Sequence, residues 1–387
     1  MIPRTLAISA VCAVVFVASL HGSPATAPRT EPSRAEASRT ELARTEGAHR
    51  ERSHTTLSRI EMTEPQMGTQ MRLVVYADDE ARARTAMRAA FDRVADLNRT
   101  LSDYQPTSEL MRLCARAGQG PIAISPDLFH ILDVAQTLAR RTNGAFDVTS
   151  GPLTHLWRRA RRFSEVPDTS RVTEARALSG FHHLHLDAAT RTATLDTPGM
   201  TLDLGGLAKG YAADEAIAVL ESHGLTRALA ALGGDVVVSE PPPDRDGWTI
   251  DVSALDAPGA PHPAALVLHN AAVSTAGDAE QWMTAAGVRY SHILDPRTGW
   301  PMTIRSSTTV IARRGLDADR LDTAIAVLGP EQGLPLAEET PGAAVLTVRQ
   351  EPTGRISVHQ SSRWPGPVLQ SSDASRLPPY HVMGPGH

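Results

Sequence analysis

The hydrophobic pattern between residues 60 and 351 changes period repeatedly, and this feature constrains the fold more than any other. Residues 71–77 have the pattern of a strand, and Asp78 and Asp79 then offer an N-cap to a helix. The apolar residues of that helix lie on one face and are Met87, Ala90, Phe91, Val94 and Leu97. Further strands are expected at 183–186, 192–195, 228–232, 248–252, 265–268, 306–311 and 343–348, and further helices at 126–142, 212–220 and 318–328. This mixture of short strands and a few helices predicts an α+β, or mixed α/β, domain.

The size and composition of the chain limit the classes of protein that fit. A chain of 387 residues exceeds the usual size of one hydrophobic core, so extensions or a second domain are expected. The hydrophobic share of 41% and the charged share of 21% are typical of a soluble folded protein. Because the net charge is −5, no basic field attracts nucleic acid, and we exclude it as a partner. Two cysteines, Cys12 and Cys114, are too few for a disulfide framework or a cysteine-based zinc site.

Residues 1–27 have the pattern of a secretory signal peptide. Arg4 precedes an apolar run that ends at Leu20, and the small residues Ala25-Thr26-Ala27 follow. The apolar run is too short for a comfortable membrane span. We therefore expect an exported protein that is periplasmic or associated with the cell envelope.

Two segments of low complexity flank the region of alternating pattern. The first half of residues 28–60 repeats arginine and glutamate every five residues, a period that matches neither a helix nor a strand. With few large apolar residues this stretch cannot offset its ordering entropy, so we predict a disordered spacer that crosses a wall or tethers the domain. Residues 352–387 are rich in proline and serine and are predicted to form a loose tail. A single folded domain is thus expected at 61–351.

The sequence contains one lysine, Lys209, among 38 basic residues, and it lies in the glycine-rich segment 203–211. Adjacent glycines let the backbone approach a ligand closely, and exposed amides at a helix start favour phosphate. A compact ammonium, rather than a flat guanidinium, would suit such a site. The spacing is not that of a P-loop. The segment is either a phosphate-binding turn or a tight turn whose lysine forms a salt bridge.

Two further segments carry residues suited to catalysis. Asp319 and Thr323 lie four residues apart in the expected helix at 318–328, so their oxygens share one face. A carboxylate, a hydroxyl and a nearby carbonyl suit Mg²⁺, although an ordinary polar stripe on a surface helix has the same pattern. His292 precedes an Asp-Pro turn at 295–296, where it is either a general base or a structural histidine.

Taken in order, these segments resemble the ApbE-like FAD:protein FMN transferases. Six blocks match that family in its order and spacing: residues 67–69, 102–104 with 108–110, 144–153, 203–211 with Asp214, 233–235, and 292–301 with 319–324. The resemblance implies a single domain of mixed sheets and helices. It also implies an enzyme that cleaves the FAD pyrophosphate, transfers FMN to a threonine or serine of an acceptor protein, and releases AMP. The acceptor would be a protein such as a membrane redox subunit or an FMN-binding domain.

The resemblance also implies roles for individual residues. Those expected to bind Mg²⁺ are Asp319 and Thr323, together with the backbone at Gly206 and Asp322. Those expected to contact FAD are Met67, Tyr104, Ala145, Phe146, Asp147, Asp203, Lys209 and Ile293. Lys209 would place a point charge beside the phosphates, and His292 would deprotonate the incoming hydroxyl.

Two positions depart from the family pattern. Ala276 replaces a serine that is common there, which would weaken nucleotide binding if the serine hydroxyl takes part. Cys114 replaces an asparagine near the flavin, which would place an exposed thiol beside a redox ring.

Other functions fit the same residues. A Mg²⁺-dependent FAD pyrophosphatase would use the same metal site and release FMN and AMP into water. An exported flavin carrier without turnover would have no need of Asp319 and Thr323. An envelope interaction protein would explain the charged repeat but not the six blocks.

Overall fold

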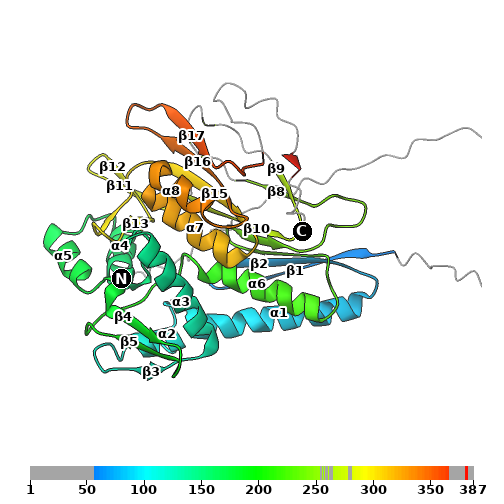
Figure 1. Ribbon diagram of the computed structural model, residues 1–387, viewed down its shortest axis with the longest axis horizontal. Coiled ribbons are helices and arrows are strands. Elements are labelled where there is room, and N and C mark those ends of the chain that lie inside the picture. Colours follow the sequence, from blue (N-terminus) through cyan, green and yellow to red (C-terminus); the bar gives the residue numbers. More distant parts are fainter. Residues whose placement is uncertain are drawn as a thin grey trace, which may run out of the picture.

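The computed structural model describes residues 56–252, 255, 257, 260, 265–277, 281–365 and 380–381 (Figure 1). The predicted signal peptide at 1–27 lies outside these residues, as do most of the predicted spacer and most of the predicted tail. Within the described part of the chain, no helix is long and apolar enough to cross a membrane.

An eight-stranded antiparallel sheet lies at the centre of the protein. In spatial order its strands are β1 (Ser58–Gln66), β2 (Thr69–Ala77), β6 (Ala228–Leu232), β7 (Asp235–Val238), β10 (Ala271–Gly277), β15 (Ser306–Ala312), β16 (Ala344–Gln350) and β17 (Ile356–Gln360). Side chains alternate between the two faces, so that Leu73 and Val75 enter one apolar cluster and Val74 enters another. Because both faces are apolar, each must be covered by another layer.

Helices cover one face of this sheet, as Figure 1 shows for α1 (Glu80–Leu101), α6 (Ala208–Ser222) and α7 (Gly315–Leu328). Helix α1 begins as predicted, since the Asp79 side chain accepts a hydrogen bond from the Arg82 N–H at 3.0 Å. Its predicted apolar face is buried. Helix α8 (Pro330–Glu338) follows α7 directly.

A small sheet packs against the opposite face. Its strand order is β18 (Tyr380–His381), β9 (Ala265–Leu268) and β8 (Trp248–Asp251). Trp248 of β8 and Leu266 of β9 share an apolar cluster with Val74 and Val273 of the large sheet. The large sheet is therefore the middle of three layers.

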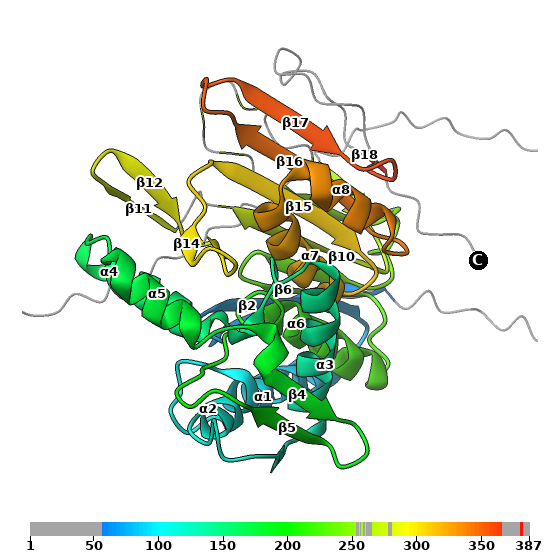
Figure 2. The ribbon, with the colours of Figure 1, turned by 60° about the vertical axis from the view of Figure 1, so that its left-hand side comes forward.

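A second group of elements extends from the end of α1 (Figure 2). Its helices are α2 (Glu109–Cys114), α3 (Pro126–Arg141), α4 (Gly151–Phe163) and α5 (Thr169–Ala177), with a sheet of β3 (Ile122–Ala123), β5 (Thr192–Leu195) and β4 (Leu184–Asp187). Two hairpins join it, β11 (Trp282–Ala285) with β12 (Val288–Ser291), and β13 (Leu294–Asp295) with β14 (Trp300–Pro301). Trp157 of α4 stacks on Tyr290 of β12 with ring centres 5.6 Å apart, which fixes the first hairpin on α4.

The structure confirms the mixed α/β fold class and the strands expected at 183–186 and 192–195, which pair as β4 and β5. The predicted bounds of 61 and 351 are too narrow, because β1 begins at Ser58 and β17 extends to Gln360. Both are the outer strands of the large sheet. Edge strands are held by backbone hydrogen bonds on one side and leave many side chains in water, so their sequences lack a strong apolar signal.

Candidate active site

Lys209 lies in the first turn of α6, where carboxylates from two other elements approach its ammonium. Its Nζ is 2.6 Å from Asp235 Oδ2 in β7 and 3.7 Å from Asp319 Oδ2 in α7. Burial acts to lower the pKa of the ammonium, but these carboxylates outweigh it and hold the pKa above its usual value. Lys209 is therefore a permanent positive charge. Helix α6 begins at Ala208, before the predicted start at 212, so Lys209 is part of the helix.

Ser274 of β10 connects two of the buried carboxyl groups. Its Oγ is 2.5 Å from Asp235 Oδ1 and 2.6 Å from Asp322 Oδ2. Because a hydroxyl has one hydrogen, it donates to one partner only, and the other contact requires a proton on the carboxyl group. Burial, followed by the charges of Asp319 and Asp235, raises the pKa of Asp322 well above its usual value. We therefore assign the shared proton to Asp322.

These side chains form a cluster with an excess of negative charge. Asp235, Asp319 and Asp322 are each at most 3% exposed. Among the residues that the structure describes, Lys209 alone forms ion pairs with them. Burial, reinforced by repulsion from Asp235 and opposed by Lys209, raises the pKa of Asp319 to about 7. With Asp322 protonated, the carboxylates of Asp235 and Asp319 still outnumber the single ammonium, so the site attracts a further cation.

The donor atoms at this cluster fit Mg²⁺, which prefers oxygen ligands. Thr323 Oγ1 lies 3.1 Å from Asp322 Oδ1, one helical turn beyond Asp319. A Cβ built on Gly206 would lie 3.1 Å from Thr323 Oγ1 and 3.3 Å from the Phe146 ring, so the glycine lets its backbone reach the hydroxyl. In the described part of the chain, no group of three or more His, Cys, Asp or Glu has metal-binding geometry. The site would thus depend on mixed ligands: carboxylate, hydroxyl and backbone carbonyl.

A close contact between α6 and α7 sets the geometry of the cluster. The Gly210 N–H donates to Asp319 Oδ2 at 2.9 Å. A Cβ on Gly210 would lie 2.2 Å from the carbonyl oxygen of Gly315, so only glycine permits this approach. Asp214 of α6 accepts hydrogen bonds from the N–H groups of Gly315 (2.6 Å) and Leu316 (2.9 Å) at the start of α7. Burial, only partly offset by these bonds, raises the pKa of Asp214 to about 6.

Tyr104 presents an aromatic face to solvent next to a second charged group. Its side chain is 75% exposed, and the guanidinium carbon of Arg158 lies 4.4 Å from its ring centre. Arg158 forms ion pairs with Asp103 and with Asp203, the latter at 3.0 Å between Nη2 and Oδ2. The Asp203 N–H donates to the Val148 carbonyl at 2.8 Å. This bond places the group of Tyr104, Arg158 and Asp203 next to the segment that contains Phe146 and Asp147.

The remaining residues expected to contact FAD surround these two groups. Asp147 is buried and accepts from the N–H and hydroxyl of Thr149, so it fixes the turn η1 (Val148–Ser150); burial raises its pKa. Ala145 and Ile293 share one apolar cluster with Ala326 of α7. Met67 occupies the turn between β1 and β2 with a φ of 48° and packs on the main core. That turn is close to the site, because a Cβ on Gly233 would lie 3.5 Å from Thr69 and 3.8 Å from the Lys209 side chain.

His292 directly follows β12 rather than lying within it. Its Nδ1 is 3.2 Å from the carbonyl oxygen of Gln281, and its backbone N–H donates to the same oxygen at 3.0 Å. A carbonyl only accepts, so in the neutral ring the hydrogen is on Nδ1 and the lone pair is on Nε2. In this tautomer Nε2 is the ring nitrogen that can accept a proton.

The two departures from the family pattern have different outcomes. The expectation of an exposed thiol at Cys114 is wrong: the side chain is buried and its Sγ accepts from the Leu202 N–H at 3.3 Å. Burial raises the pKa of this thiol to about 11, so it has a structural role. Ala276 packs in the apolar cluster with Ala145 and Ile293.

The sequence did not predict a role for three residues of the site. Asp235 was part of a matched block but was given no role, and Ser274 and Arg158 were not considered. The only local signal for Asp235 is the pair of glycines before it, because a Gly-Gly turn places the following side chain at the start of a strand, here β7. Ser274 and Arg158 act through contacts with residues 39 and 45 positions away, which no local pattern reveals.

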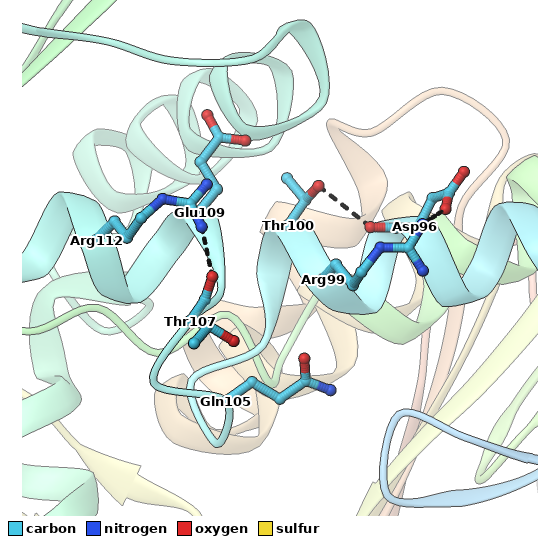
Figure 3. A pocket seen from close by; sticks show the side chains of 7 residues that line it. All are labelled: Asp96, Arg99, Thr100, Gln105, Thr107, Glu109 and Arg112. Carbon is cyan, nitrogen blue, oxygen red and sulfur yellow. Dashed lines mark hydrogen bonds and ion pairs between the residues drawn. The ribbon is translucent and has the colours of Figure 1, made fainter.

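A separate polar hollow of about 470 Å³ lies beside the 102–108 loop (Figure 3). Its lining residues are Asp96, Arg99, Thr100, Gln105, Thr107, Glu109 and Arg112. Several are paired with each other, as Arg99 is with Asp96, and Arg112 with the Thr107 carbonyl (Figure 3). It includes none of the predicted site residues, so we do not place the chemistry there.

Comparisons with known proteins agree with this arrangement. The ApbE family profile matches residues 67–347. A FAD:protein FMN transferase of Treponema pallidum is 32% identical over 315 residues, which are 78% of this chain and 86% of that protein. One of Klebsiella pneumoniae is 32% identical over 294 residues, covering 74% of this chain and 83% of the relative.

Solved structures support the same relationship. The flavin transferase ApbE from Vibrio cholerae matches with a TM-score of 0.70 at 29% identity, over 79% of this chain and 98% of that one. The apo form of the Pseudomonas stutzeri flavinyl transferase ApbE matches with a TM-score of 0.69 at 29% identity, over 79% and 96%. Sequence match, fold and the order of the six matched blocks all agree, and this chain belongs to the ApbE family.

Proposed function

We propose that this protein transfers FMN from FAD to the hydroxyl of a threonine or serine in an acceptor protein, releases AMP, and depends on Mg²⁺. The observation that carries the proposal is the acidic cluster with one ammonium at the contact between α6 and α7. The relatives from Treponema pallidum and Klebsiella pneumoniae are FAD:protein FMN transferases, which supports the same reaction.

The chain's own residues have distinct tasks in this reaction. Tyr104 offers its exposed face to the isoalloxazine ring, and Lys209 places a positive charge beside the diphosphate. His292 Nε2 takes the proton of the acceptor hydroxyl. The hydroxyl oxygen then forms a bond to the phosphorus of the FMN half. The bond from that phosphorus to the bridging oxygen breaks, and its electron pair leaves with AMP.

Asp319 and Thr323, with the backbone at Gly206 and Asp322, would hold the Mg²⁺. When bound, this ion neutralises charge on the diphosphate oxygens. Gly210 and Asp214 keep α6 against α7, so that Lys209 and the metal ligands face the same phosphates.

The test is incubation of the full chain with FAD, MgCl₂ and a recombinant FMN-binding domain, with and without EDTA. We expect the intact mass of the acceptor to rise by one FMN less one water, and EDTA to abolish the increase. Free FMN and AMP with an unchanged acceptor would instead identify a FAD pyrophosphatase. FAD binding without any cleavage would identify a carrier.

We also propose that the protein is exported to the periplasm or cell envelope, on the basis of the pattern of residues 1–27. Cell fractionation followed by N-terminal sequencing tests this. Full-length protein found only in the cytoplasmic fraction would contradict it.

A further inference from the structure

Arg158 of α4 contacts two of the residues that are expected to bind FAD. Its guanidinium carbon lies 4.4 Å from the ring centre of Tyr104. Its Nη2 donates to Asp203 Oδ2 at 3.0 Å, and its Nη1 donates to Asp103 Oδ2. A planar guanidinium can bind carboxylates along its edge while its face lies over an aromatic ring, which a compact ammonium cannot do.

The charge of Arg158 is permanent and its position is fixed. Burial acts to lower the pKa of its guanidinium, but Asp203 and Asp103 outweigh this effect and raise the pKa. The Asp103 side chain is 8% exposed, and His155 Nε2 lies 3.7 Å from its Oδ2. Burial acts to raise the pKa of Asp103, but His155 and Arg158 hold it below its usual value. A charge that is partly buried between two carboxylates cannot leave them without a large cost.

Helix α4 is held in place by contacts other than those of Arg158. The Trp157 side chain is buried, and its Nε1–H donates to the Gly299 carbonyl at 2.8 Å. At the start of the helix, a Cβ built on Gly151 would lie 2.5 Å from the Thr201 carbonyl oxygen, so the backbones pack closely there. Packing of the helix therefore does not explain why Arg158 is buried between two acids.

The ring of Tyr104 depends on Arg158 for its orientation. The backbone of its loop is fixed locally, since the Tyr104 N–H donates to Ser102 Oγ at 3.2 Å and Ser108 Oγ donates to the Ser102 carbonyl at 2.7 Å. The side chain itself extends into solvent, and among the residues that the structure describes Arg158 alone stacks on it. With the guanidinium on one face, the other face of the ring is open to a planar ligand.

Asp203 extends the contacts of Arg158 to the segment that contains Lys209. Its Oδ1 accepts from the Gly205 N–H at 2.8 Å, while its Oδ2 binds Arg158. Gly206, whose backbone is expected to bind the metal, follows directly, and α6 then carries Lys209. One guanidinium thus connects the residue proposed for the flavin ring with the segment proposed for the diphosphate.

We propose that Arg158 is a positioning residue for FAD, which holds the Tyr104 ring and the Asp203 carboxylate in the arrangement that the dinucleotide binds. The inference rests on the proposed function, because it requires FAD to extend from Tyr104 to the Lys209 segment. Arg158 acts through these two residues and not on the reacting atoms. Its loss therefore weakens binding of FAD without slowing the chemical step at His292.

The test measures FAD binding separately from FMN transfer. Binding is followed by flavin fluorescence in MgCl₂ without acceptor, and transfer to a recombinant FMN-binding domain by intact mass. The variants are Arg158→Met, Arg158→Lys, Tyr104→Leu and the double variant Tyr104→Leu/Arg158→Met. The matched control is Arg162→Met, which removes an exposed arginine of the same helix that forms no ion pair with the described residues. Urea unfolding of each protein checks that it is folded.

We expect Arg158→Met to raise the Kd and the KM for FAD by about tenfold and to change kcat by less than about twofold. In the Tyr104→Leu background the same substitution should change the Kd by about threefold or less, because one of the two groups that Arg158 holds is already gone. Arg158→Lys keeps the charge but cannot stack on the ring, so it should restore the affinity only in part. Arg162→Met should behave as the wild type.

Three results would overturn the positioning role while leaving the proposed function intact. They are wild-type FAD affinity in Arg158→Met, an equal loss of affinity with and without Tyr104, and a fall in kcat with an unchanged KM. If Arg158→Met does not fold, Arg158→Lys replaces it in the same cycle, because lysine keeps a cation between the two carboxylates. A folded wild-type protein that does not bind FAD would refute the proposed function itself.

Discussion

The substitution Gly210→Ala tests whether the contact between α6 and α7 creates the site. The added Cβ would lie 2.2 Å from the Gly315 carbonyl oxygen and 2.8 Å from the Asp319 Cβ. Contacts below 3 Å are not tolerated, so the two helices must separate by roughly 1 Å. The obstacle is backbone, which cannot swing away as a side chain would.

Two opposing effects decide the outcome of this substitution. Alanine in place of glycine inside a helix stabilises it by about 1 kcal/mol. Overpacking in a dense core costs typically about 1–3 kcal/mol, and a clash with backbone lies at the upper end. We therefore expect the free energy of unfolding to fall by about 1–2 kcal/mol. A shift of about 1 Å at reacting groups lowers rates by about a hundredfold, so FMN transfer should fall far more than stability.

Urea unfolding and the FMN-transfer assay measure the two effects on one protein sample. Ala218→Ser is the control, because it adds one atom to an exposed position of the same helix. A Gly210→Ala protein that is more stable than the wild type and fully active would refute the reasoning, since propensity alone would then have decided the result.

Three further substitutions test individual side chains. Burial raises the pKa of Asp214 from 3.8 to about 6, so its contribution to stability is complete below about pH 4 and is lost, by about 3 kcal/mol, as the pH rises to 6. Asp214→Asn should remove that part of the pH dependence in urea titrations; an unchanged slope would contradict the assignment. His292→Ala should lower kcat for FMN transfer by about a hundredfold and leave FAD affinity nearly unchanged, whereas lost affinity would reassign His292 to binding. Lys209→Arg should weaken FAD binding in a fluorescence titration, because a planar guanidinium cannot replace a compact ammonium between two carboxylates.

The spacing of apolar residues along the sequence predicts the helices and strands of this fold that have one buried face. The buried face of α1 and the strands β4 and β5 are examples. When one face of an element is buried, apolar residues recur in its sequence at the period of a helix or a strand. β1 and β17 were missed for the opposite reason, since pairing at a sheet edge uses backbone groups that every residue has. The spacing of Asp319 and Thr323 is likewise local to one helix and was correctly read as a shared face.

The electrostatic character of the site depends on contacts that no local pattern contains. Asp235 comes from a strand, Lys209 from α6 and Asp322 from α7, and each sequence segment alone fits a surface position. Only the fold makes Asp235 and Asp322 buried neighbours that share Ser274 and places Lys209 beside Asp235.

Burying the carboxylates of Asp235 and Asp319, and a third acid that must hold a proton, beside one ammonium disfavours folding, because like charges repel more strongly where water is excluded. A purely structural core would be more stable with fewer acids. The excess of negative charge is therefore better explained by cation binding than by stability. A cation that binds only the folded state stabilises that state and offsets the cost of burying the acids.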